Sequence, residues 1–110
     1  MKLLLGIGAD DDLSALDATV ARAREAGDEL TVATDADGRV RSRLDELDFV
    51  AEVRQIQNDP GSRLVELAAS GGYDRIVLPG GQRTPMGKIS LGETAEFVLL
   101  NARTSVTLIR

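Results

Sequence analysis

The chain has 110 residues, and because its 18 Asp and Glu outnumber its 13 Lys and Arg, its formal net charge is −5 at pH 7. Such an acidic balance, without a clustered basic face, argues against sequence-independent DNA binding, which requires neutralisation of phosphates. The chain has neither Cys nor His, which excludes disulfides, thiolate catalysis and imidazole as a general base or metal ligand.

The first predicted elements are a strand and a helix. Residues 3–7 form an apolar run without alternation, which is typical of a central strand covered on both faces. Gly8 and Ala9 turn the chain, and one of the aspartates at 10–12 is expected to cap the next helix. That helix carries apolar residues at helical spacing and is predicted to end at Gly27.

The middle of the chain predicts a strand over 29–33, a helix around 40–47 and a third strand over 49–53. Apolar and charged residues alternate in the third strand, so it is expected at an edge of the sheet. A further helix is predicted from Pro60, a residue favoured at the first helical position, to the glycine pair that begins at Gly71.

The last elements are a strand over 75–78, a helix near residues 93–102 and a strand over 106–109. Ser90 and Glu93 have the spacing of a capping box, in which the two residues satisfy each other's backbone N–H groups. Strands that alternate with helices predict an α/β fold with a parallel sheet, here as a single domain over residues 1–110.

A glycine-rich loop follows the fourth predicted strand. A strand that leads into such a loop, which then opens a helix, is a common way to present backbone N–H groups to an anion. The N–H groups of Gly80, Gly81 and Gln82 are candidate phosphate donors, and Arg83 and Lys88 would add positive charge.

Two residues at this loop oppose phosphate binding. Pro79 has no N–H group, and its ring stiffens the place where close backbone approach is needed. Glu93 would put a carboxylate where phosphates approach the helix N-terminus, and a like-charge contact at 4 Å costs about 4 kcal/mol at an effective dielectric of about 20. The capping box gives Glu93 a structural role instead.

The last third of the chain, from the strand ending IVL through the loop to LGETAEFVLLNARTSVTLI, resembles the universal stress protein family. The first strand with its turn, LLLGIGADDD, and the segments after it fit the family more loosely. This resemblance implies a three-layer α/β/α fold, like that of the adenine nucleotide alpha hydrolases, with five parallel strands in the order 3-2-1-4-5. The ends of the first and fourth strands would then flank a crevice that brings residues 8–12 up against residues 79–83.

The resemblance also implies where a nucleotide would bind and why that site is degenerate. Nucleotide-binding members have a G-x-x-G pattern, nine further residues and G-[ST]. Aligned on Gly92, this chain has Pro79 and Gln82 at the two loop glycines and Glu93 at the hydroxyl position. The framework matches, whereas the phosphate-binding residues mostly do not.

In nucleotide-binding relatives an aspartate after the first strand holds the ribose or the base. Gly8 occupies the matching place here, and Asp10 follows two residues later as a substitute. Val32 in the second strand and Thr94 at the start of the last helix complete the candidate contacts. The ligand, if one binds, would be ATP or AMP, accompanied by Mg²⁺.

Two other kinds of site fit the sequence less well. An acidic run after the first strand together with Asp59 is similar to the Mg²⁺ site of a phosphoacceptor receiver domain, but such domains need a lysine and a helix after the fifth strand. Asp59 precedes Pro60 and fits a helix cap better. A phosphate-ester hydrolase is the least favoured alternative, because no serine has a histidine to activate it.

The leading interpretation is a non-catalytic stress-response domain with a degenerate nucleotide site that acts through protein contacts; the alternative is an ATP- or AMP-binding module. Val106, Leu108 and Ile109 form an apolar edge strand, so we expect a homodimer that pairs residues 106–109 of two copies, as the resemblance also implies. No segment approaches the roughly 20 apolar residues of a membrane span, and a cytoplasmic location is expected.

Overall fold

The structure, a computed structural model, describes residues 1–80, 82–83, 89–90 and 92–109. The elements in chain order are β1 (Lys2–Ile7), α1 (Ser14–Ala26), β2 (Glu29–Thr34), α2 (Asp37–Glu46), β3 (Glu52–Gln55), α3 (Pro60–Ser70), β4 (Arg75–Pro79), β5 (Gln82–Arg83), β6 (Ile89–Ser90), α4 (Glu93–Asn101) and β7 (Ser105–Ile109).

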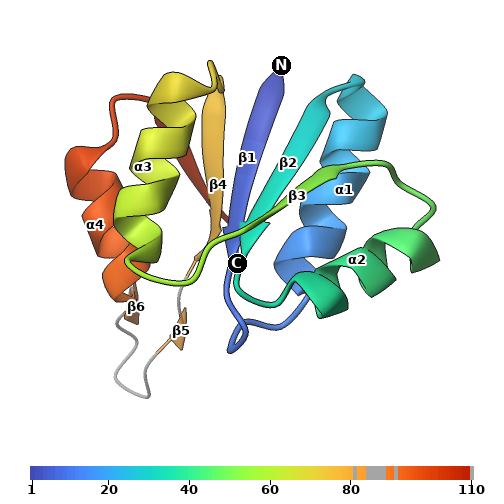
Figure 1. Cartoon of the computed structure of the whole chain (residues 1–110), viewed down its shortest axis with the longest axis horizontal. Coiled ribbons are helices and arrows are strands. Elements are labelled where there is room, and N and C mark those ends of the chain that lie inside the picture. Colours follow the sequence, from blue (N-terminus) through green and yellow to red (C-terminus); the bar gives the residue numbers. More distant parts are fainter. Residues whose placement is uncertain (81, 84–88, 91, 110) are drawn as a thin grey trace.

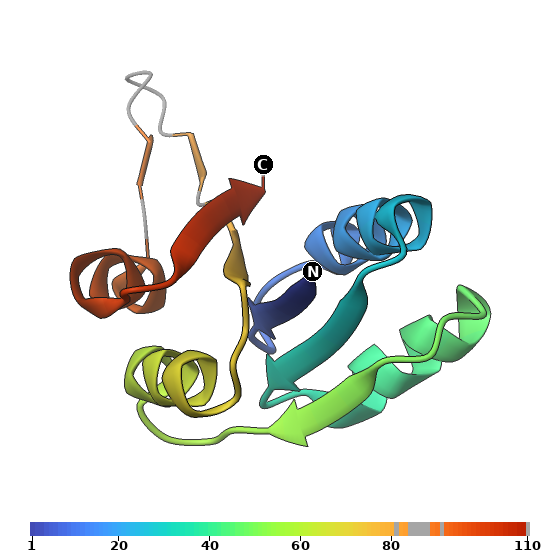
Figure 2. The same ribbon diagram turned by 90° about the horizontal axis from the view of Figure 1, so that it is seen from above.

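Five strands form one parallel sheet in the order β3-β2-β1-β4-β7. With β7 as the fifth strand of the predicted set, this confirms the predicted fold class and the order 3-2-1-4-5. Helices α1 and α2 lie on one side of the sheet and α3 and α4 on the other, which gives three layers (Figures 1 and 2). The change of side between α2 and α3 follows from right-handed crossovers that run outward from β1 in both directions.

The core has two parts, one on each face of the sheet, and β1 contributes to both. Leu3 and Leu5 belong to the cluster under α1 and α2, whereas Leu4 belongs to the cluster under α3 and α4. Side chains that alternate between two covered faces explain why the sequence of β1 is a continuous apolar run. The prediction of a central first strand is therefore confirmed.

The two edges of the sheet are β3 and β7. The edge position of β3 was predicted, but the strand begins at Glu52 rather than at residue 49. Phe49 and Ala51, which supplied the alternating pattern, instead pack against the core cluster under α1 and α2. An alternation of apolar residues can thus mark a loop that packs on the core as well as a strand.

Helix α1 ends as predicted and begins differently. Gly27 has the left-handed φ of 72° that suits a glycine after a helix. The helix starts at Ser14, and Leu13 rather than an aspartate holds the capping position. Asp12 accepts hydrogen bonds from the Ser14 hydroxyl and from the Ser14 N–H (2.8 Å), which hold the pKa of its carboxyl below the ordinary value.

Two further cap predictions change in the structure. The capping box is wrong: Ser90 lies in β6, Gly92 caps α4 in an extended conformation, and Glu93 is the first helical residue without a side-chain cap hydrogen bond. Ser90 cannot cap α4 because its backbone pairs with Gln82 of β5. Asp59 does occupy the cap of α3, but its side chain makes no cap hydrogen bond.

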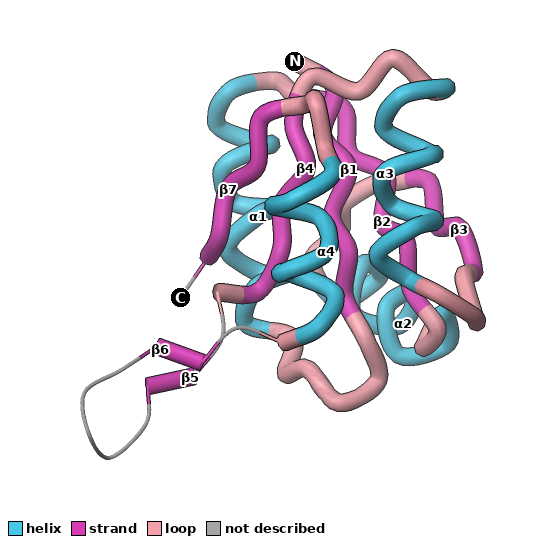
Figure 3. Tube along the Cα trace, turned by 90° about the vertical axis from the view of Figure 1, so that its left-hand side faces the viewer, coloured by secondary structure: helices cyan, strands magenta, loops and turns pink. Residues whose placement is uncertain are grey.

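A two-stranded antiparallel hairpin, β5 and β6, stands in the segment predicted to be a loop. It projects from the body of the molecule at the lower left of Figure 3. Two-residue strands are too short to show a period-2 pattern, so the sequence did not reveal them. Within the described part of the chain, no helix combines the length and the apolar character that crossing a membrane requires.

Candidate functional site

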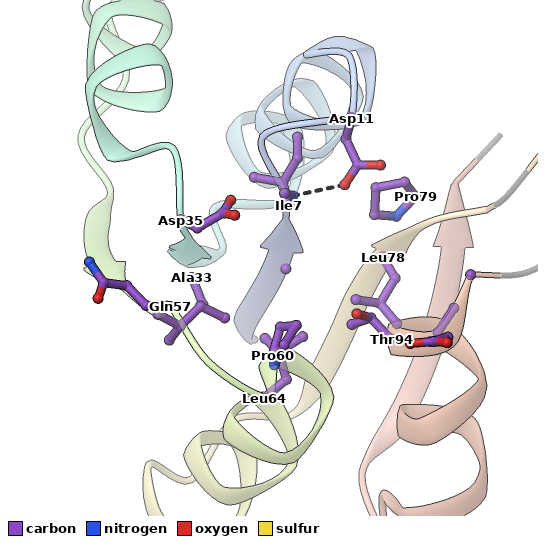
Figure 4. A pocket seen from close by; sticks show the side chains of 16 residues that line it. Ile7, Asp11, Ala33, Asp35, Gln57, Pro60, Leu64, Leu78, Pro79 and Thr94 are labelled. Atoms are coloured by element: carbon purple, nitrogen blue, oxygen red, sulfur yellow. Dashed lines mark hydrogen bonds between the residues drawn. The ribbon is translucent and has the colours of Figure 1, made fainter.

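A cleft beside the sheet centre lies where β1 and β4 end, at the crevice expected for this topology. Its volume is about 380 Å³, which falls in the range of small-molecule pockets, about 300–1,000 Å³. Figure 4 shows the lining side chains around the open centre. They come from the ends of β1, β2 and β4, from the segment before α3, and from the first turns of α3 and α4.

Two aspartates fix the loop after β1, which forms one wall of the cleft. The Asp11 carboxylate accepts a hydrogen bond from the Gly8 N–H at 2.8 Å, drawn as a dashed line in Figure 4. The Asp35 carboxylate accepts one from the Ala9 N–H, also at 2.8 Å. The N–H groups of this loop that face these carboxylates are therefore already bonded and cannot receive an anion.

Arg39 of α2 holds the outer side of the same loop. Its guanidinium donates to the Ala9 carbonyl at 2.7 Å and to the Asp11 carbonyl at 3.3 Å. The loop is thus bonded through its N–H groups on one side and its carbonyl groups on the other. These hydrogen bonds hold the loop in the conformation in which Asp11 lines the cleft.

The floor and the lower wall are apolar. Leu64 and Leu78 are almost completely buried beneath the opening, with exposed fractions of 1% and 2%. Gly6 of β1 lies between them, and a Cβ at this position would come within 2.6 Å of the Leu64 side chain. The absence of a side chain at Gly6 is therefore what allows α3 to pack so close to the sheet.

The charged side chains of the described residues that line the cleft are acidic. Asp11 and Asp35 come from one side and Glu93, the first residue of α4, from the other. Among the described residues that line the cleft, none is Lys or Arg. Such a surface favours neutral or cationic groups over phosphates, because its field repels anions.

The structure brings part of the predicted site together. Gly8, Gly92 and Thr94 line the cleft. Asp10 is exposed and does not line it; its neighbour Asp11 does. Val32 is fully buried in the core cluster under α1 and α2, so β2 reaches the cleft through other residues.

The remaining predicted residues belong to the segment after β4. Gly80 is buried, and its N–H donates to the Ile109 carbonyl at 2.5 Å, so this candidate phosphate donor is used by the link between β4 and β7. Arg83 contributes its backbone to β5. Gly81 and Lys88 lie outside the described residues.

Three polar lining residues were not named as candidate contacts: Asp11, Asp35 and Gln57. Asp11 stands in the acidic run 10–12, of which one aspartate was expected to cap the next helix and Asp10 to contact a nucleotide. Asp35 directly follows β2, and a polar residue directly after a parallel strand is a signal for the crevice. Gln57 follows the edge strand β3 in the same way, two residues after its end.

Comparison with known proteins gives a consistent family. The family model described as the universal stress protein family matches residues 39–110. No curated protein matches the chain.

Among solved structures, the chain is similar to a universal stress protein from Archaeoglobus fulgidus, with a TM-score of 0.73, 21% identity, and coverage of 100% of this chain and 98% of the other. It is also similar to a universal stress protein in complex with cAMP, with a TM-score of 0.71, 24% identity, and coverage of 98% and 96%. A third is UspA from Lactobacillus plantarum, with a TM-score of 0.68, 18% identity, and coverage of 100% and 97%. At identities this low, the structural similarity shows a shared fold alone.

Proposed function

The chain belongs to the universal stress protein family, and from that premise we propose that it is a non-catalytic, homodimeric stress-response domain whose cleft does not hold nucleoside polyphosphates. It acts through protein contacts, and its place is the cytoplasm. The lack of His and Cys anywhere in the chain supports a non-catalytic role, because the usual general base and the thiolate nucleophile are missing.

The observation that carries this proposal is the acidic lining of the cleft. A polyphosphate with its chain at the start of α4 would meet Glu93, and its other end would approach Asp11 and Asp35. Two unit charges 4 Å apart repel by about 1 kcal/mol in bulk water and by about 4 kcal/mol at an effective dielectric of about 20. The Gly80 N–H, a donor that could offset this repulsion, is engaged by Ile109.

Thermal unfolding in the presence of millimolar Mg-ATP, Mg-ADP or buffer alone tests the proposal. A ligand at 100 times its dissociation constant would add about 2.7 kcal/mol of stability, a shift of several degrees. We expect no shift for the natural sequence. A shift with Mg-ATP at these concentrations would refute the proposed loss of polyphosphate binding.

The variant Glu93→Gln tests the electrostatic reason. Removing one like charge worth about 1 kcal/mol should raise Mg-ATP affinity about fivefold. Glu96→Gln is the matched control, because Glu96 is in the same helix but does not line the cleft. Equal affinities of the two variants would show that the Glu93 carboxylate is not what excludes the phosphates.

The homodimer follows from the free edge at β7. Val106 and Leu108 are only partly buried, and among the described residues β4 is the one strand that pairs with β7. Exposed edges are usually paired or blocked, and a two-fold axis lets identical strands pair. Helix α4 covers one face of β7, since Val106 and Leu108 pack against the core cluster that contains Val98 of α4.

On helix α4, Leu100 is 84% exposed. In a dimer that pairs β7 of two copies, the α4 helices of both copies would lie close to the interface. Sedimentation velocity at micromolar concentration should show a dimer that Leu100→Glu weakens. Val50→Glu is the control, because Val50 is 96% exposed and precedes β3 at the opposite edge. A monomer for the natural sequence would contradict the proposal.

A second candidate function is the binding of a nucleoside monophosphate such as AMP or cAMP. The size of the cleft favours it, as does the cAMP complex of a structural neighbour. Asp11 and Asp35 could accept hydrogen bonds from ribose hydroxyls or a base amino group. Stabilisation by AMP or cAMP without stabilisation by Mg-ATP would favour this candidate over the first.

A further inference from the structure

A second cleft lies on the face of the sheet that carries α1, between this helix and the strands β4 and β7. Helices α1 and α2 cover β1, β2 and β3, whereas α3 and α4 cover the other face. Helix α1 also packs against β4, where Val77 belongs to the cluster under α1 and α2, but in Figure 2 no helix of the described part of the chain lies over β7 on that side. The cleft there has a volume of about 210 Å³.

Two arginines line this cleft, in contrast to the acidic cleft at the strand ends. Arg22 comes from α1 and Arg75 from β4. Neither forms an ion pair with a carboxylate in the described part of the chain. The acid that lines the cleft, Asp28, is paired with the amino group of Met1 at 3.0 Å.

The Arg75 guanidinium is held in place by the sheet. Its Nη1 donates to the Thr107 hydroxyl at 2.6 Å across the β4–β7 pair. A guanidinium has five N–H donors in a planar fork, so most of them remain for a ligand. The Thr107 hydroxyl accepts this bond and still has its own hydrogen to donate.

Apolar side chains surround these donors. Leu3 and Val77 on the sheet are 6% and 4% exposed, and Ile109 stands beside them on β7. Positive groups next to an apolar floor suit a ligand that has one anionic end and a short apolar body. The volume of about 210 Å³ suits a ligand of small-molecule size.

We propose that this cleft binds a small organic carboxylate, with its charge on Arg75 and Arg22 and its aliphatic or aromatic body on the sheet between Leu3 and Ile109. Guanidinium groups recognise both carboxylates and phosphates. A carboxylate carries one charge, whereas a phosphate ester carries between one and two near neutral pH. A single charge matches the apolar surroundings of the two guanidinium groups better than a double one, because each further charge placed beside apolar side chains costs desolvation, and this favours the carboxylate.

An NMR titration of the ¹⁵N-labelled protein with hexanoate and with hexanamide, its neutral counterpart, tests this assignment. We expect millimolar hexanoate to shift the amide signals of residues around Arg75 and Thr107, and hexanamide to bind about tenfold more weakly, because hydrogen bonds to charged groups are the stronger ones. Arg75→Gln and Arg22→Gln should each weaken hexanoate binding several-fold. Arg63→Gln, an exposed arginine on α3 that does not line this cleft, is the matched control and should bind as the natural sequence does.

Several results would overturn the proposal. Hexanoate shifts confined to the cleft at the strand ends would place the ligand elsewhere, and equal affinities for acid and amide would remove the charge recognition. Tighter binding of inorganic phosphate would overturn the ligand class. Arg22 is exposed on the surface of α1, so the Arg22→Gln variant should fold normally. Unchanged hexanoate binding by this variant would therefore also count against the assignment.

Discussion

The substitution Gly6→Ala probes the packing that forms the floor of the acidic cleft. A Cβ at this position would lie 2.6 Å and 3.0 Å from the two terminal carbons of Leu64, and 3.0 Å from a terminal carbon of Leu78. Contacts below 3.0 Å force a shift, and both leucines are at most 2% exposed. Overpacking of a filled core costs about 1–3 kcal/mol, so the melting temperature should fall by about 5 °C or more.

The control for this experiment is the same substitution at Gly38. Gly38 lies in α2, and a Cβ there would meet no atom within 4 Å. Gly38 is the second residue of α2, and alanine has a higher helix propensity than glycine, so Gly38→Ala should raise the melting temperature slightly. Thermal unfolding followed by circular dichroism measures both variants. A stability of Gly6→Ala equal to or above that of the natural sequence would refute the reasoning.

Two further outcomes are expected from contacts away from the clefts. Tyr73→Phe removes the buried hydrogen bond from the Tyr73 hydroxyl to Thr31 (2.9 Å) and should cost about 1–2 kcal/mol in chemical denaturation; an unchanged midpoint would contradict this. Asp17 receives two hydrogen bonds from Arg43, at 2.8 and 2.6 Å, which hold the pKa of its carboxyl below the ordinary value of 3.8. A lowered pKa in the folded state stabilises the protein above the unfolded pKa, and this contribution is lost as the pH falls through the folded pKa. Asp17→Asn should therefore be less stable at neutral pH and lose less stability below about pH 4 than the natural sequence. Urea unfolding at several pH values measures this, and an equal loss of unfolding free energy by both proteins between neutral pH and about pH 4 would contradict it.

The regular elements were predictable because their residues repeat with the period of the structure they form. The continuous apolar run of β1 indicated a strand covered on both faces, and Gly27 and Pro60 marked helix ends through their backbone preferences. These signals are local and depend on a few neighbouring residues. The order of the strands came from the family resemblance, since pairing between distant segments leaves no local pattern.

The site was less predictable because it depends on side-chain direction in turns. Asp10 and Asp11 are adjacent in an acidic run, and only the three-dimensional turn decides that Asp11 bonds Gly8 and faces the cleft. The role of Gly80 was also hidden, because its N–H bonds Ile109, which is 29 positions away in the sequence. Glu93 was expected to fold back on Ser90, but the pairing of β5 with β6 moved Ser90 out of reach of the helix cap.

Titration calorimetry of Mg-ATP into the purified protein, after any bound nucleotide has been removed, tests the acidic cleft most directly. We expect no measurable binding at millimolar nucleotide for the natural sequence, and the appearance of weak binding for Glu93→Gln. Saturable binding of Mg-ATP with a micromolar dissociation constant by the natural sequence would contradict the proposal that the carboxylates of this cleft exclude polyphosphates.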